Sequence, residues 1–141
     1  MQIEGGPRTT HGGSDNADCS GALSYVRCEF AGYPFKEDQE INAITFGSVG
    51  SATQIDHVQV SYSNDDSYEW FGGAVNAKYL VSYHTWDDDF DTDNGFCGKV
   101  QFCLAYVSPA LPIPRRRTAS RATTTAKALQ PLLSPPVSFR T

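Results

Sequence analysis

Acidic residues are concentrated in one ten-residue stretch of this 141-residue chain, Trp86-Asp87-Asp88-Asp89-Phe90-Asp91-Thr92-Asp93-Asn94-Gly95. Carboxylates packed this densely repel one another, which raises their pKa values unless solvent or a cation intervenes. Calcium is the natural counterion, because it is a hard ion that takes six to eight oxygen ligands. The stretch therefore predicts either a calcium site or a solvated acidic corner whose Asp side chains cap backbone amides.

A related stretch lies 22 residues earlier, Asn64-Asp65-Asp66-Ser67-Tyr68-Glu69-Trp70-Phe71-Gly72-Gly73. Superposition of the two places Asp65 on Asp87, Asp66 on Asp88, Tyr68 on Phe90 and Glu69 on Asp91. Self-similarity at a fixed period is typical of repeat architectures, whose neighbouring strands lie about 4.8 Å apart. Matched acids would then stack in pairs. The candidate metal ligands are Asp65, Asp66, Glu69, Asp87, Asp88, Asp89, Asp91 and Asp93.

The acidic stretch does not fit an EF-hand loop, because Gly95 comes one place late and Val100 stands where the closing Glu belongs. In an extended segment, alternate side chains share a face. We therefore expect Asp87, Asp89, Asp91 and Asp93 to line one side, with Phe90 on the other.

Aromatic residues within these stretches allow two interpretations. Tyr68 and Phe90 are expected to stack between successive repeats. Trp70 and Trp86 are candidates for a carbohydrate-stacking surface, since exposed aromatic rings bind the apolar faces of sugars. Burial of the aromatic residues in the core is the favoured alternative. His57 and His84 lack a nearby Ser or Cys pattern and are expected at the surface.

Short segments of alternating apolar and polar residues predict β-strands at residues 26–30, 41–47, 55–62, 79–83 and 102–106. Residues 55–62 superpose on residues 23–30 at an offset of 32, so a loop of about ten residues interrupts the period of 22. The inward face of residues 79–83 stays open, since both Leu80 with Ser82 and Tyr79 with Val81 and Tyr83 are plausible.

Short strands, Gly-rich corners and a period of about 22 residues predict an all-β parallel solenoid. An antiparallel sandwich is the alternative, because evenly spaced strands with turns look the same in one sequence. A leucine-rich repeat is excluded, since residues 1–106 contain only Leu23, Leu80 and Leu104.

Composition divides the chain into residues 1–22, a loop rich in Gly, Asn and Asp, residues 23–106, which carry the repeats, and residues 107–141. Residues 1–106 carry 5 basic and 16 acidic residues, a net charge of −11, and residues 107–141 carry 6 and 0, a net charge of +6. Such an acidic body is a poor nucleic-acid binder. The last segment predicts a disordered tail or a shifted reading frame. No apolar run is long enough to span a membrane.

Several motifs in order resemble a family of secreted or surface bacterial proteins built on a right-handed parallel β-helix. The resemblance covers about residues 10–106 and rests on residues 12–33, 40–47, 64–73 and 87–102, and the absence of a signal peptide at the N-terminus suggests a fragment. Such proteins carry lipoprotein signals or type IX sorting domains, which implies the outer-membrane surface of a Gram-negative bacterium. The resemblance implies a scaffold or binding protein for polysaccharide or cell-surface components.

A carbohydrate-active enzyme, either a polysaccharide lyase or a hydrolase, is the alternative function. A lyase needs a basic residue beside calcium, and the five Lys and Arg of residues 1–106 are not adjacent to the acidic stretches in sequence. A hydrolase needs two carboxylates about 5–9 Å apart, and no single pair of carboxylates stands out among so many acids. The sequence therefore favours a non-enzymatic scaffold. Cysteine spacing matches no zinc site, and a Cys97–Cys103 disulfide stays open.

Overall fold

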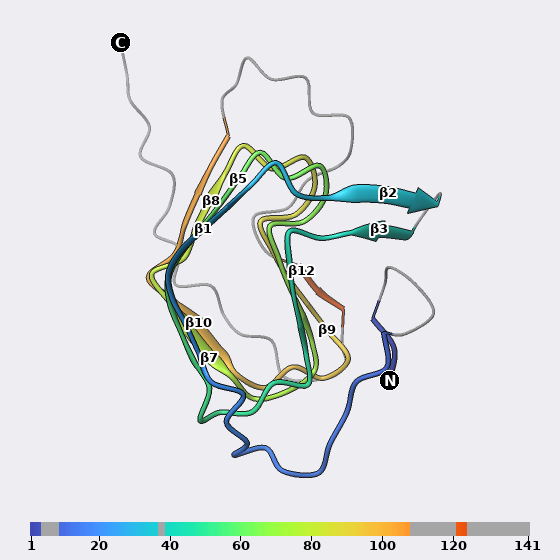
Figure 1. Cartoon of the computed structure of the whole chain (residues 1–141), viewed down its shortest axis with the longest axis vertical. Coiled ribbons are helices and arrows are strands. Elements are labelled where there is room, and N and C mark those ends of the chain that lie inside the picture. The colour runs from blue at the N-terminus through green and yellow to red at the C-terminus, as the bar shows by residue number, and fades with distance from the viewer. Residues whose placement is uncertain (4–8, 37–38, 108–120, 124–141) are drawn as a thin grey trace.

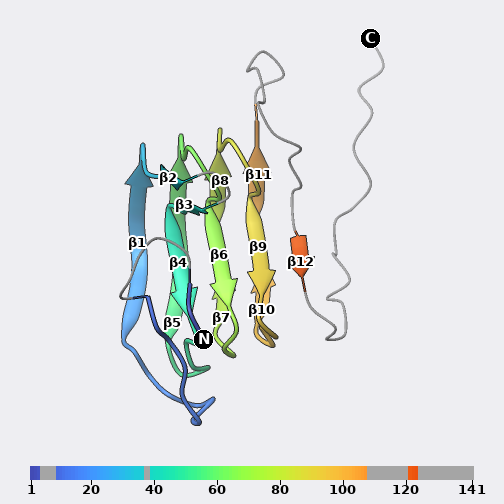
Figure 2. The same ribbon diagram turned by 90° about the vertical axis from the view of Figure 1, so that its right-hand side faces the viewer.

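The computed structural model describes residues 1–3, 9–36, 39–107 and 121–123, and every regular element in these residues is a β-strand. No helix that could cross a membrane occurs in this part of the chain. The chain winds into a coil with three sides (Figure 1), and its successive turns lie side by side along the coil axis (Figure 2). This is the predicted parallel β-helix.

One six-stranded parallel sheet forms two sides of the coil. Its strands are β1 (Ala22–Glu29), β5 (Gln54–Ser61), β7 (Asn76–Lys78), β8 (Val81–Tyr83), β10 (Lys99–Gln101) and β11 (Leu104–Tyr106). The long strands β1 and β5 run along both sides, whereas later turns use one short strand for each. β5 therefore pairs with β7 on the first side and with β8 on the second. The predicted parallel stacking of residues 26–30, 58–62 and 79–83 is confirmed.

A second parallel sheet forms the third side, from β4 (Ile44–Gly47), β6 (Tyr68–Phe71), β9 (Phe90–Asp93) and β12 (Arg121–Thr123). β12 pairs with β9. The sequence analysis did not predict β12, because residues 107–141 have no acidic residue, glycine or periodic pattern. These three residues lie within the segment for which a disordered tail was predicted. Its remainder, apart from residue 107, lies outside the described residues.

The register explains the two offsets seen in the sequence. Leu23 pairs with Ile55, and Val26 pairs with Val58, at an offset of 32. Tyr68 pairs with Phe90 at the regular offset of 22. Eight of the ten extra residues lie between β1 and β4, since Ile44 pairs with Tyr68 at an offset of 24. This segment contains a short antiparallel hairpin, β2 (Tyr33–Lys36) and β3 (Gln39–Ile41), which projects from the coil (Figure 1). The sequence analysis predicted a loop for part of this hairpin and one continuous strand over residues 41–47, which the structure divides between β3 and β4.

The corners of the coil are made by residues with a left-handed backbone. One corner consists of Tyr25, His57, Tyr79 and Phe102, with φ between 49° and 57°, and a second consists of Phe30, Tyr62 and His84, with φ of 56–57°. A left-handed conformation costs a non-glycine residue about 1–2 kcal/mol. The rings in both corners stack on their neighbours, for example Tyr25 on His57 at 4.5 Å between centroids and Phe30 on Tyr62 at 5.2 Å. Stacked aromatic pairs contribute about 0.5–1.5 kcal/mol, which offsets much of this cost.

The core fills the inside of the coil with side chains from all three sides. Its fully buried members include Val58, Val60, Tyr68, Trp70 and Leu80. Leu80 and Ser82 are both completely buried while Tyr79 is 42% exposed, which resolves the inward face that the sequence left open. The four cysteines are free thiols, and Cys28 packs against the core as a half-buried apolar group.

Candidate metal centre

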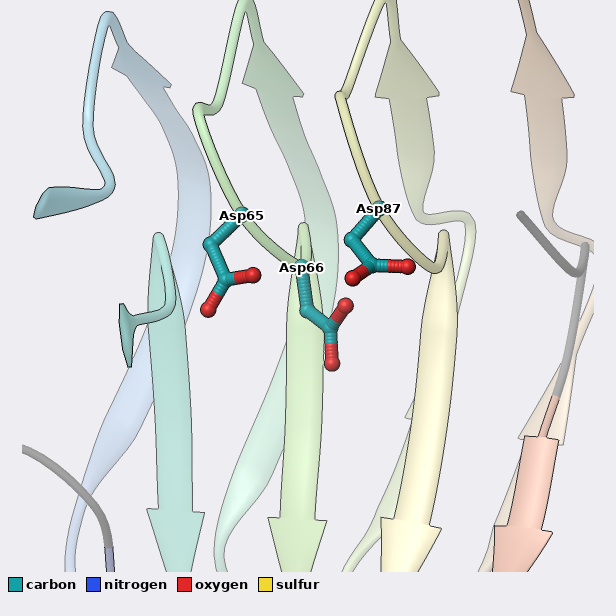
Figure 3. A group of neighbouring side chains, drawn as sticks. All are labelled: Asp65, Asp66 and Asp87. Carbon is teal, nitrogen blue, oxygen red and sulfur yellow. The ribbon is translucent and has the colours of Figure 1, made fainter. Parts of the chain in front are cut away.

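Two acidic loops connect the second side of the coil to the third, and each precedes a strand of the third side. Asp65 and Asp66 come from the loop before β6, and Asp87 comes from the equivalent loop before β9 (Figure 3). Hydrogen bonds hold the two loops together: the Asp88 amide donates to Asp66 Oδ1 at 2.8 Å, and Thr85 Oγ1 donates to the Asp65 carbonyl at 2.7 Å. The predicted stacking of Asp65 and Asp66 beside Asp87 and Asp88 is therefore present.

Two groups of carboxylates lie close enough to share one cation. The first is Asp65, Asp66 and Asp87, and the second is Asp66, Glu69 and Asp91, with one oxygen of each member within 4.8 Å of the others. Asp66 belongs to both groups. Among the described residues, five of the eight predicted ligands are thus brought together, and Asp88, Asp89 and Asp93 fall outside both groups.

Most of these acids are buried, so the prediction of a solvated acidic corner is wrong. Asp65 and Asp66 are 6% and 8% exposed, and Glu69, Asp88, Asp89 and Asp91 are also buried. Burial, followed by the negative charges of Asp65, Asp91 and Asp87, raises the pKa of Asp66 from its ordinary 3.8 to about 8, although the hydrogen bond from the Asp88 amide lowers it. Without a cation, Asp66 therefore carries a proton at neutral pH.

Polar side chains in the interior below these loops form hydrogen bonds with some of the buried acids. The Asn42 side-chain amide donates to Glu69, and Ser82 Oγ donates to Asp89 Oδ1 at 2.6 Å. Ser82 also shares a 2.6 Å hydrogen bond with Ser67 from the preceding turn. The predicted alternation of Asp87, Asp89, Asp91 and Asp93 on one face does not hold, because β9 begins only at Phe90. Asp88 and Asp89 precede that strand in the loop, and both turn inward.

The two tryptophans have different surroundings. Trp70 is fully buried and stacks on Phe46 and Tyr68, so the prediction that it binds carbohydrate at the surface is wrong and the core interpretation is confirmed. Trp86 is 49% exposed and lies in the loop that carries Asp87. Its amide donates to the Ser63 carbonyl at 3.0 Å, which ties it to the loop carrying Asp65. Trp86 remains a carbohydrate-stacking candidate.

The corner rings stack on one another along the coil. Successive rings are nearly parallel, as in the 8° between Tyr25 and His57, and the end rings Tyr25 and Phe102 are 81% and 70% exposed. The prediction that His84 lies at the surface is wrong, since it is 8% exposed and stacks on Tyr62. Its position in the repeat, 22 residues after Tyr62, is the signal that predicts a place in this stack.

The sequence analysis missed a polar group on the first side of the coil. Asp56, which is 7% exposed, accepts hydrogen bonds from Ser24 Oγ, from Gln54 Nε2 at 2.8 Å and from His57 Nδ1 at 2.8 Å. The hydrogen bond from His57, followed by those from Ser24 and Gln54, holds the pKa of Asp56 well below its usual range. This carboxylate is therefore ionised and well satisfied. The alternation of polar and apolar residues in Gln54-Ile55-Asp56 was the available sequence signal that Gln54 and Asp56 face outward.

Comparison with known protein families matches residues 4–125 to the pectate-lyase-like β-helix domain. The chain belongs to this family. Membership confirms the β-helix resemblance inferred from the motifs and extends the match past residue 106, over β12. It relates the protein to carbohydrate-associated β-helices without specifying an activity. Comparisons with curated proteins and with solved structures found no match.

Proposed function

We propose that the chain is a carbohydrate-binding scaffold in which a calcium ion joins the two acidic loops and orders Trp86. One observation carries the proposal: three carboxylates from two successive turns, those of Asp65, Asp66 and Asp87, have oxygens within 4.8 Å of one another beside a half-exposed Trp86. The metal would be held by carboxylates whose mutual repulsion it relieves.

Calcium suits this site better than softer metals do. The donor set is made entirely of carboxylate oxygens, and calcium accepts six to eight oxygen ligands at variable geometry. Three carboxylates leave further coordination positions for water or for sugar hydroxyls. Because a cation favours the ionised form of a carboxylate, binding would lower the pKa of Asp66 from about 8 and release its proton.

Trp86 supplies the apolar surface that a sugar ring requires. An indole face stacks on the C–H face of a sugar, while the cation or nearby carboxylates hold its hydroxyls. The hydrogen bond from the Trp86 amide to the Ser63 carbonyl of the neighbouring turn joins the two loops into one surface. The partners proposed are therefore polysaccharides, including those of a cell surface.

The alternative, a carbohydrate-active enzyme, has less support in this part of the molecule. A hydrolase requires a pair of carboxylates that the scissile bond of a polymer can reach. Glu69, Asp89 and Asp91 are buried beneath the loops, and Asn42 and Ser82 already bind Glu69 and Asp89. We therefore expect binding without cleavage of the polymer.

Location on the outside of the cell is part of this proposal, because calcium is available there and the motif resemblance implies secretion or attachment to the outer membrane. Protease treatment of intact cells tests the location, since an external protein is digested and an internal one is protected.

Thermal unfolding in millimolar CaCl₂ tests the calcium site, with NaCl of equal ionic strength as the control for charge screening. A ligand that binds only the folded state at a hundredfold excess over its Kd stabilises it by about 2.7 kcal/mol. We expect calcium to raise the Tm of the wild type but not of Asp65→Asn/Asp87→Asn, while Asp93→Asn, which changes an acid outside both groups, keeps the shift. Equal effects of calcium and matched sodium would refute the site.

Sedimentation with insoluble polysaccharides tests the role of Trp86. Trp86→Ala should lose calcium-dependent binding, whereas Trp86→Phe should retain part of it. Retention of full binding by Trp86→Ala would place the carbohydrate elsewhere.

A further inference from the structure

The two ends of the coil present matching strand edges. In the part of the chain that the structure describes, each side of the coil is four strands deep, so the coil begins and ends with a complete turn. β1 and β4 belong to the first turn, and β10, β11 and β12 belong to the last (Figure 2). Among the described residues, each of these five strands pairs with another strand on one edge only. A strand edge of this kind is a template for pairing with another chain.

The repeat makes the two edges equivalent in register. Successive strand pairs place Arg27 and Leu104 in one outward row along the coil axis, at its opposite ends. Val26 and Cys103, one residue earlier, therefore share an inward row. The inward side chains at both ends are apolar groups that the coil covers only in part, namely Leu23, Val26 and Cys28 in the first turn and Val100 and Cys103 in the last.

An aromatic stack runs along one corner from the first turn to the last. Its rings are Tyr25, His57, Tyr79 and Phe102, with 4.5, 4.8 and 5.4 Å between successive centroids. These distances are close to the spacing of about 4.8 Å between neighbouring strands. The end rings, Tyr25 and Phe102, are 81% and 70% exposed. A further turn at either end would therefore continue the stack at the same spacing.

The charges of the two ends are complementary. Residues 1–53, which include β1 and β4, carry 3 basic and 7 acidic residues, a net charge of −4. Residues 97–123, which include β10, β11 and β12, carry 5 basic residues and no acidic residue, a net charge of +5. A first turn placed on a last turn therefore brings opposite charges together, whereas two identical ends would repel each other.

We propose that copies of this chain stack end to end, with β10 and β11 of one copy pairing in parallel with β1 of the next and β12 pairing with β4. In the register of the coil, Phe102 would stack on Tyr25 of the next copy, and Cys103 would lie beside its Val26. The two edges are different surfaces, so the contact is heterologous and repeats as an open filament. Four turns of about 4.8 Å give an axial repeat of about 19 Å per copy.

Sedimentation velocity of the full chain over a range of concentrations tests the assembly, with EDTA present throughout. We expect the mean sedimentation coefficient to rise continuously with concentration. Tyr25→Lys places a positive charge against the basic end of the neighbouring copy, and it should raise the concentration at half-assembly by roughly tenfold or more. Tyr25→Phe keeps the ring and should change this concentration by less than about threefold.

A sedimentation coefficient that does not depend on concentration would overturn the inference. Growth that stops at a dimer would overturn it as well, because a closed dimer requires an isologous contact between identical ends. The wild-type measurement needs no substitution, so the inference stays testable even where a variant fails to fold. Calcium and carbohydrate are absent throughout, so these outcomes are independent of the function proposed above.

Disulfide trapping tests the register of the contact. Paired residues of neighbouring strands lie about 4.8 Å apart, within the range of about 4.4–6.8 Å between Cα atoms that a disulfide spans. The chain has four free cysteines. Cys103 becomes the single native cysteine in a background that carries Cys19→Ser, Cys28→Ala and Cys97→Ser.

Val26→Cys in this background should form a ladder of covalent oligomers on mild oxidation, because position 26 of one copy meets Cys103 of the next. Arg27→Cys is the matched control, since the neighbouring side chain faces the opposite side of β1 and should give no ladder. Mass spectrometry of the digested oligomers identifies the joined positions. Equal crosslinking of the two variants, or a linkage between identical positions, contradicts the proposed stacking.

Discussion

Asp66 shows how one residue couples folding to proton or metal binding. It is 8% exposed, belongs to both groups of three carboxylates, and its carboxylate accepts a hydrogen bond from the Asp88 amide. Ionising it without a cation places a further negative charge in a poorly solvated site. Asp66 is therefore stable either as a neutral acid or as a metal ligand, and the pH determines which of the two forms is favoured.

Asp66→Asn should remove a pH dependence of stability. Unfolded Asp66 titrates near 3.8 and folded Asp66 near 8, so the folded state binds the proton more tightly. The contribution of Asp66 to the free energy of unfolding is therefore highest below about pH 4. It falls as the pH rises toward 8 and levels off above pH 8. Each unit of pKa difference corresponds to about 1.4 kcal/mol, so the total amounts to several kcal/mol.

Urea unfolding in calcium-free buffer measures this effect. Asp66→Asn should match the wild type near pH 4 and exceed its stability at pH 8.5, since Asn resembles the protonated acid and still accepts from Asp88. Asp93→Asn serves as the control outside both groups. Parallel pH profiles for wild type and Asp66→Asn would contradict the assignment of the raised pKa.

At this scale the sequence predicted which acids of the two stretches lie side by side, but it did not predict their surroundings. The offset of 22 residues correctly paired Asp65 with Asp87 and Glu69 with Asp91. It did not predict burial, because ionisable residues are normally exposed and the pattern contains no sign that the loops turn inward. Trp70 was ambiguous for a related reason, since an aromatic residue in a repeat suits either a core or a surface.

At the scale of elements, the corners decide where each strand ends. A third corner aligns Ser48, Gly72 and Asn94, with φ of 51°, 67° and 51°. Glycine tolerates this conformation freely, Asn moderately and β-branched residues poorly. The sequence indicated corners through its glycines, but Tyr, Phe and His in left-handed conformations are uncommon and were not predictable from residue type alone.

Asn94→Val should destabilise the protein by about 1–2 kcal/mol, and Asn94→Gly should be neutral or slightly stabilising, because the exposed side chain stands at a left-handed position. Gln101, exposed in β10, gives the matched control with the opposite order, since a strand accepts Val better than Gly. Chemical denaturation compares the four variants. The same order of Val and Gly at both positions would show that backbone conformation does not determine the corner.

At the scale of the whole molecule, each turn stacks mainly on the turns before and after it, and stability approximates a sum over turns and their interfaces. The 22-residue period predicted this stacking, and the superposition at an offset of 32 predicted the pairing of Val58 with Val26. The hairpin β2–β3 and the strand β12 were not predicted, because both lie where the periodic pattern is interrupted. The fold tolerates the hairpin since it projects outward without altering the register of β5 on β1.

Inserting a second copy of residues 65–86 after residue 86 should add one turn in register. The second side has four turns, in β1, β5, β8 and β11, so the urea m-value should rise by roughly a quarter, because m scales with the surface exposed on unfolding. Urea unfolding should be measured at pH 5, because Asp66 and its copy are protonated at that pH. A 21-residue copy, residues 66–86, shifts the register by one and reverses every side chain that follows. That variant should lose stability and cooperativity, and equal behaviour of the two insertions would show that stacking register does not determine this fold.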